Sequence, residues 1–197
     1  RQQVINDDLG AFLRLPELIG AEAGRCITRT VYQLLLSNAG SFFSTANKNL
    51  ITGSASALSV ASLDSAYTKF VEQKTPSGGS LGIMPETLLV GPSLKGTGHA
   101  LTKSATVVIA GGTDTKAPAG NQHEGAYKLV MEPELSNSVN TGSSATQWYM
   151  FGNPAEIAAL RIGFVAGRDA PTIVRKDTGL GLQGIGWEAT VDFGVAF

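Results

Sequence analysis

The hydrophobic pattern of the first forty residues predicts one long helix. From Pro16 to about Asn38, steps of 100° per residue place an apolar set on one broad face. Glu22, Arg25 and Arg29 fall on the opposite face. The apolar set consists of Ile19, Ala23, Cys26, Ile27, Thr30, Val31 and Leu34. A helix of this length is about 30 Å long at 1.5 Å per residue, which predicts a spine for the domain.

The residues before this helix predict a cap and a short first helix. Asn6, Asp7 and Asp8 have side-chain oxygens that can accept the free N–H groups of a following turn. They precede a predicted helix over residues 9–14. Asp7 and Asp8 could also be a carboxylate pair for acid–base chemistry, but capping is the favoured interpretation.

Downstream, the pattern changes from helical spacing to strands. Residues 39–60 predict an irregular connection with one short strand, and Ser62 is the predicted cap of a second helix over residues 63–74. The segment 111–125 is rich in Gly, Pro and Asn and predicts a loop. Further elements are a strand at 87–90, a short helix at 94–101, and strands at 106–110, 127–133, 147–152, 160–167 and 186–197. The predicted fold class is α+β.

Composition narrows the function classes. The chain has 197 residues, of which 43% are hydrophobic and 16% charged, enough apolar surface for a folded core. The net charge of −1 and the lack of a Lys/Arg block argue against a dedicated nucleic-acid binder. A single cysteine excludes an internal disulfide, and no apolar run reaches the length of a membrane span.

Two motifs suggest enzyme chemistry, and both lack the required context. Residues 179–184 match G-x-G-x-x-G, but a strand follows where a dinucleotide site needs a helix. Residues 78–82 match G-x-S-x-G around Ser80, with Glu86 and His99 following in the order of a hydrolase triad. Ser80 does not stand between a predicted strand and a helix, which favours a loop residue.

Among the remaining reactive side chains, the sequence predicts no catalytic residue and no cofactor or metal site. His99 and His123 are the only histidines, they show no ligand spacing, and both are expected at the surface. Cys26 is expected to face the core of the long helix as an inert packing residue.

Several runs resemble one protein family. RQQVINDDLGAFLRLPELIGAEAGR (residues 1–25) and FFSTANKNLITGSASALSVASLDSAYTKF (residues 42–70) resemble the major head subunit of Mu-like phages and prophages. IMPETLLVGPSLKGTGHAL, YKLVMEPELS, QWYMFGNP and VDFGVAF continue the match in the expected order. The resemblance covers most of the chain and is weakest at residues 102–122. Gly91 stands in place of a family proline and Val191 where a His is common.

The resemblance implies a Hong Kong 97-type capsid fold. Residues 1–45 and 158–197 would form the peripheral P-domain, which carries the spine helix, and residues 46–157 the axial A-domain. In this fold an N-terminal arm and an E-loop hairpin precede the spine helix, and neither has a counterpart in this sequence. The expectation is that the chain is the later part of a larger one.

The functional hypothesis is a structural capsid protein without enzymatic activity. It self-assembles through pentamers and hexamers into an icosahedral shell around non-specifically enclosed DNA, with a scaffold or prohead protease as assembly partner and no membrane partner. Assembly in the bacterial cytoplasm and location in the virion follow from the resemblance. Glu22, Arg25 and Arg29, with His123 and Glu124 in the 111–125 loop, are the candidate inter-subunit contacts. Alternatives are an encapsulin-type compartment, a serine hydrolase using Ser80 and a prophage remnant that does not assemble.

Overall fold

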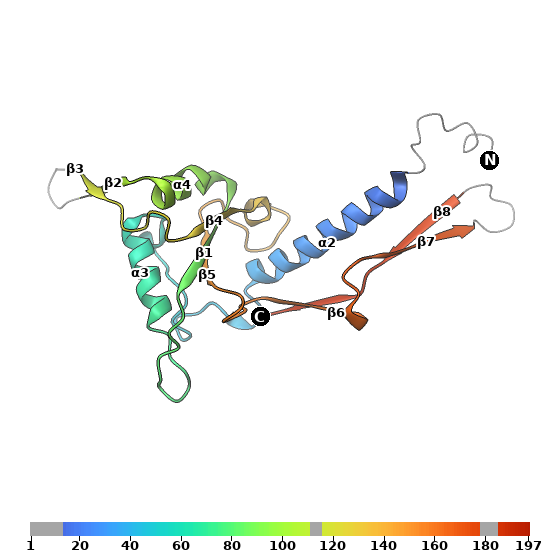
Figure 1. Cartoon of the computed structure of the whole chain (residues 1–197), viewed down its shortest axis with the longest axis horizontal. Coiled ribbons are helices and arrows are strands. Elements are labelled where there is room, and N and C mark those ends of the chain that lie inside the picture. The colour runs from blue at the N-terminus through green and yellow to red at the C-terminus, as the bar shows by residue number, and fades with distance from the viewer. Residues whose placement is uncertain (1–13, 111–115, 178–184) are drawn as a thin grey trace. The chain divides into compact units, whose positions relative to one another are not determined.

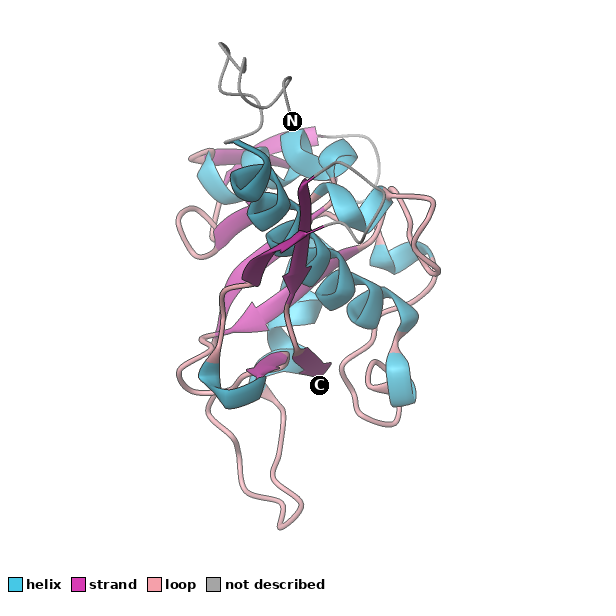
Figure 2. Ribbon diagram, turned by 90° about the vertical axis from the view of Figure 1, so that its right-hand side faces the viewer, coloured by secondary structure: helices cyan, strands magenta, loops and turns pink. Residues whose placement is uncertain are grey.

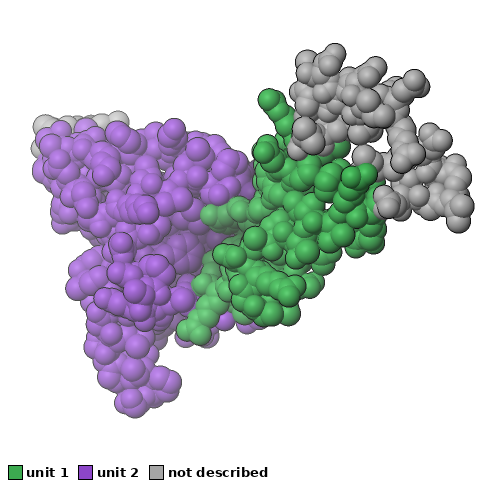
Figure 3. Space-filling view, turned by 45° about the vertical axis from the view of Figure 1, so that its right-hand side comes forward, with its two compact units in different colours: residues 1–32, 160–196 green, residues 33–159, 197 purple. Residues whose placement is uncertain are grey.

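The chain divides into two compact units. The structure is a computed structural model that describes residues 14–110, 116–177 and 185–197. Unit 1 comprises residues 1–32 and 160–196, and unit 2 comprises residues 33–159 with Phe197 (Figure 3). Both contain helix and strand, in agreement with the predicted α+β class. The predicted caps at Asp7 and Asp8 and the start of the helix at 9–14 lie outside the described residues.

The long helix, α2, spans Leu15–Ser37 and confirms the helix predicted from Pro16 to about Asn38 (Figure 1). Pro16 stands in its first turn, where the missing N–H costs no hydrogen bond. Asn38 ends the helix in a left-handed conformation with φ 48°, and its side chain bonds both the N–H and the carbonyl of Phe43. Only two side chains of α2, Leu35 and Leu36, are buried, and both belong to unit 2.

The core of the molecule lies in unit 2, around a three-stranded sheet. The central strand β1 (Pro85–Val90) pairs in parallel with β4 (Lys128–Met131) and antiparallel with β5 (Trp148–Gly152). Helices α3 (Val60–Val71) and α4 (Lys95–Lys103) pack against this sheet. The buried cluster contains Leu58, Leu63, Leu88, Val90, Leu101 and Tyr127. Leu129 of β4 and Trp148 and Met150 of β5 pack against this cluster, so all three strands and both helices share one hydrophobic core.

Helix α3 begins three residues earlier than predicted. Ser59, not Ser62, is its cap: Ser59 Oγ accepts from the Ser62 N–H at 3.2 Å. In return the Ser62 hydroxyl accepts from the Ser59 N–H at 2.8 Å. This reciprocal capping box satisfies two N–H groups at once and buries Ser62, so the second serine lies inside the first turn.

The predicted loop at 111–125 is partly wrong. Residues Lys116–Gly120 form strand β3, which pairs antiparallel with β2 (Thr106–Ala110). Pro118 stands opposite Val108. Each strand of a two-stranded ribbon has one edge without a partner strand, and on that edge the missing N–H of proline breaks no inter-strand hydrogen bond. Gly and Pro content indicated a loop because neither residue favours a strand, but cross-strand pairing prevailed. Residues 111–115 lie outside the described part.

Several connections of unit 2 contain short 3₁₀ turns, and a buried amide holds one of them. The predicted irregular segment 39–60 contains two of them and no strand. Asn140 is buried, donates to the Glu134 carbonyl and carboxylate, and accepts from Gln33 Nε2 at 3.3 Å. It therefore ties the loop after β4 to the last turns of α2. Within the described residues the 3₁₀ elements are Ala39–Ser41, Ser54–Ser56, Pro92–Leu94, Pro133–Ser136 and, in unit 1, Val165–Gly167.

Unit 1 consists of the exposed length of α2 and two narrow ribbons (Figures 1 and 2). Strands β6 (Arg161–Phe164) and β9 (Phe193–Ala196) form one, and β7 (Thr172–Asp177) and β8 (Ile185–Thr190) the other. The last predicted strand is thus two strands, and β7 was not predicted. Ile173 of β7 lies against α2 at Gly20, where an added Cβ would be 3.9 Å from it.

Candidate interaction surface

The outer face of α2 carries the predicted contact residues. Glu22, Arg25 and Arg29 are all exposed, as their helical spacing predicted. The Arg25 guanidinium donates to the Glu22 carboxylate one turn away, and both side chains are largely in solvent. An exposed pair of this kind adds little stability, so it can exchange partners. Leu18 lies on the same face and is 60% exposed.

Leu18 is a surface residue that the sequence interpretation missed, although its spacing was a usable signal. It lies one turn before Glu22 and nearly opposite the apolar face that contains Ile19 and Ala23. An exposed leucine beside an ion pair resembles the apolar centre and polar rim of a protein interface.

Unit 1 has no core of its own within its described residues. None of those residues is buried, whereas all eleven buried hydrophobic side chains belong to unit 2. A two-stranded ribbon is marginally stable in water, and one helix covers only one side of it. The exposed aliphatic side chains of this unit are Leu15, Leu18, Ile162, Val165 and Val174. This surface is the part of the chain whose stability would increase most if a partner covered it.

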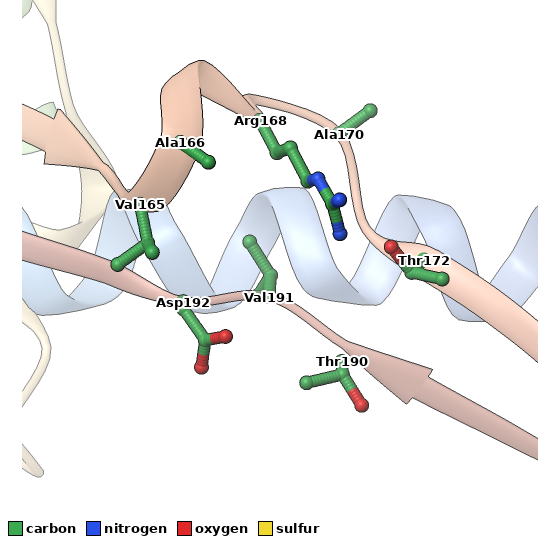
Figure 4. A pocket seen from close by; sticks show the side chains of 8 residues that line it. All are labelled: Val165, Ala166, Arg168, Ala170, Thr172, Thr190, Val191 and Asp192. Atoms are coloured by element: carbon green, nitrogen blue, oxygen red, sulfur yellow. The ribbon is translucent and has the colours of Figure 1, made fainter.

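A shallow hollow of about 250 Å³ lies where the two ribbons of unit 1 meet (Figure 4). It is lined mainly by small and aliphatic side chains, with Arg168 extending across it and Asp192 pointing away on the other segment. The Val165 N–H donates to the Asp192 carbonyl at 3.1 Å and fixes the crossing. Ala166, which lies between Val165 and Arg168 in the chain, has φ 54°. This left-handed conformation costs a non-glycine residue about 1–2 kcal/mol.

Cys26 is exposed, and its predicted place in a core is wrong. It stands at one edge of the apolar face of α2, about 60° from the centre of that face at 100° per residue. Ile173 of β7 approaches the helix at Gly20, about 120° round the helix from Cys26, and Cys26 stays in solvent.

His123 is buried, only 5% exposed, so the surface position predicted for it is wrong. Its Nε2 atom lies 3.0 Å from Asp64 Oδ1 on α3, at ion-pair distance but without the alignment of a hydrogen bond. Tyr127 Oη lies 3.4 Å from its Nδ1. Asn121 binds the last carbonyls of α4 and accepts from the His123 N–H, which draws the segment inward. Glu124 is exposed, as a contact residue must be.

Two tyrosines of unit 2, the buried Tyr127 and the partly buried Tyr149, give a testable pH dependence. Burial raises the pKa of Tyr127 above its ordinary value of about 10, and nearby Tyr67 and Asp64 raise it further. Burial also raises the pKa of Tyr149. The folded state thus favours the neutral phenols, so this contribution is constant below pH 10 and is lost as the pH rises above it. Absorbance at 295 nm should show Tyr127 and Tyr149 ionising above pH 10, and Tyr127→Phe should remove one of these late steps. A titration curve that Tyr127→Phe leaves unchanged above pH 10 would contradict this.

The candidate hydrolase residues do not form a triad. Ser80 lies in an exposed hairpin, bridged to Lys74, that leads toward β1 and not into a helix. Its hydroxyl accepts from the Gly82 N–H, and no hydrogen bond joins it to Glu86 or His99 in the described part of the chain. Glu86 and His99 are both exposed. The G-x-G-x-x-G run at 179–184 lies outside the described residues.

Neither a candidate metal site nor a candidate membrane span occurs in residues 14–110, 116–177 and 185–197. They contain no group of three or more His, Cys, Asp or Glu side chains that could hold a metal ion. None of their helices is long and apolar enough to cross a membrane.

Comparison with known proteins identifies the family. The sequence profile of a family described as "Phage capsid protein" matches residues 1–197, the full length of this chain. Searches of curated proteins and of solved structures gave no significant match. Phage capsid proteins are structural, non-enzymatic components of the virion that assemble as oligomers into a shell. The chain belongs to the phage capsid protein family.

Proposed function

We propose that this chain is the major head subunit of a Mu-like phage or prophage. Many copies self-assemble, through pentamers and hexamers, into an icosahedral shell around DNA, with a scaffold or prohead protease as partner during assembly in the bacterial cytoplasm. The observation that carries the proposal, beside the family match, is the absence of buried residues in the described part of unit 1. A subunit in a closed lattice obtains that missing burial from its neighbours.

We assign a Hong Kong 97-type fold to the subunit, with a P-domain over residues 1–45 and 158–197 and an A-domain over 46–157. Support comes from the two compact units, which are likewise built from discontinuous and continuous segments. Their limits fall at 32/33 and 159/160. The long helix with its ribbons corresponds to the expected spine of the P-domain.

Sedimentation velocity and negative-stain electron microscopy of the full-length natural protein test the assembly. Closed particles or five- and six-membered rings are the expected result. A strictly monomeric, folded species at high protein concentration would argue against it.

The content of purified particles separates this proposal from the encapsulin alternative, which shares the proposed fold. Nucleic acid inside the particles supports a phage head, whereas a protein cargo without nucleic acid supports a compartment.

A further inference from the structure

The two units carry different positively charged side chains. All seven arginines of the chain fall in unit 1, and seven of the eight lysines fall in unit 2. The arginines are residues 1, 14, 25, 29, 161, 168 and 175, and the lysines of unit 2 are residues 48, 69, 74, 95, 103, 116 and 128. Every arginine and lysine whose burial the structure describes is exposed. Burial within the single chain therefore does not explain the separation.

Arginine and lysine differ in what they do at a surface. The guanidinium group is planar, weakly hydrated and able to bind a carboxylate through two parallel hydrogen bonds, whereas the lysine ammonium is strongly hydrated. Protein interfaces are correspondingly enriched in arginine and depleted in lysine. The separation indicates that unit 1 is covered in the functional state and that the lysine side chains of unit 2 stay in water.

The charge balance of unit 1 favours a second copy of the chain over nucleic acid as its partner. Unit 1 contains eight Arg and Lys residues and eight Asp and Glu residues, so its net charge is zero. A surface that binds the phosphates of DNA needs an excess of positive charge. A surface that carries equal numbers of both charges complements a second copy of itself, because each arginine finds carboxylates on the neighbour.

We infer that unit 1 makes the principal contacts between copies of this chain, with its arginines bound to carboxylates of a neighbouring copy. Arg25 on α2, Arg161 on β6 and Arg175 on β7 distribute these contacts over the helix and both ribbons. Exposed aliphatic residues, Leu18 on α2 and Val165 beside the hollow of Arg168, supply the apolar part of the interface. This inference rests on the proposed function, since it names the partner of the same surface.

A charge-conserving exchange tests the inference. One full-length variant carries Arg25→Lys, Arg161→Lys, Arg168→Lys and Arg175→Lys. The matched control carries Lys48→Arg, Lys69→Arg, Lys74→Arg and Lys103→Arg in unit 2. We expect the first to raise the protein concentration needed for assembly by at least about tenfold and the control to change it less than about twofold. Circular dichroism and the Tm of the unassembled proteins establish that both variants fold.

The outcomes separate this inference from the proposed function. If the wild type forms no particles, the proposed function fails. If the wild type assembles and the four-arginine variant assembles equally well, the inference is overturned while the function stands. If that variant assembles normally but its particles lose their nucleic acid, the arginines bind DNA and the inference is likewise overturned.

The lone thiol of the chain provides a second measurement that needs no substitution. Cys26 is exposed on α2 in the single chain. We expect a maleimide to label it at least about tenfold more slowly in assembled particles than in dissociated subunits, because the neighbour covers this side of the helix. Equal labelling rates would show that the side of α2 that carries Cys26 is not part of the interface.

Discussion

Gly142→Ala is expected to destabilise unit 2 by about 3 kcal/mol or more. Gly142 has φ 83°, a left-handed conformation that is strained for any residue with a Cβ. An added Cβ would also lie closer than 3.0 Å to the Leu36 carbonyl oxygen, a separation that real Cβ atoms essentially never show. The carbonyl belongs to the backbone of α2 and cannot move aside as a side chain could. Urea denaturation of the unassembled chain measures the loss.

Gly125→Ala is the matched control for this prediction. Gly125 has φ 69°, but nothing lies within 4 Å of the position of an added Cβ. This substitution isolates the conformational cost, about 1–2 kcal/mol. Equal losses for the two variants would mean that the close approach of the loop to Leu36 contributes nothing.

The importance of Gly142 could not be predicted from the sequence, and the reason is general for this chain. The contact joins residues more than a hundred positions apart, and the local sequence does not distinguish Gly142 from the other glycines in polar loops. His123 was misjudged for the same reason, since Asp64 lies on α3 and Asn121, in the same segment as His123, is bonded to the distant carbonyls of Leu101 and Ser104. The burial of a residue that depends on contacts distant in the sequence cannot be predicted from local residue spacing.

Local spacing did predict the elements that are held by their own periodicity. Helix α2 and strand β1 were predicted within about two residues, because a continuous apolar face or run specifies each of them. Strands β3 and β7 were missed because neither carries the apolar run of a buried strand: β3 contains Pro118 and Gly120, and β7 ends in Arg175, Lys176 and Asp177. In the interaction surface, exposure of Glu22, Arg25 and Arg29 followed from spacing, whereas exposure of Cys26 depended on how narrow the covering ribbon is.

Leu88→Ala is expected to destabilise unit 2 by about 2–5 kcal/mol and to leave unit 1 nearly unchanged. Leu88 is fully buried in the central strand, where removing its side chain leaves a cavity that the sheet and helices α3 and α4 cannot fill. The only two tryptophans report the units separately, Trp148 in unit 2 and Trp187 in unit 1. Trp187→Phe and Trp148→Phe variants of the unassembled chain, unfolded in urea, therefore give one fluorescence transition for each unit.

The order of these transitions tests the physical basis of assembly. Because the described part of unit 1 contains no buried residue, Trp187 is expected to report unfolding at lower urea concentration than Trp148. In assembled particles the Trp187 transition should move to higher urea, since neighbouring copies cover the helix and ribbons of unit 1. Coincident transitions in the dissociated subunit would show that unit 1 is stable without neighbours. The exposed aliphatic side chains and arginines of unit 1 would then need no partner to account for the stability of the unit.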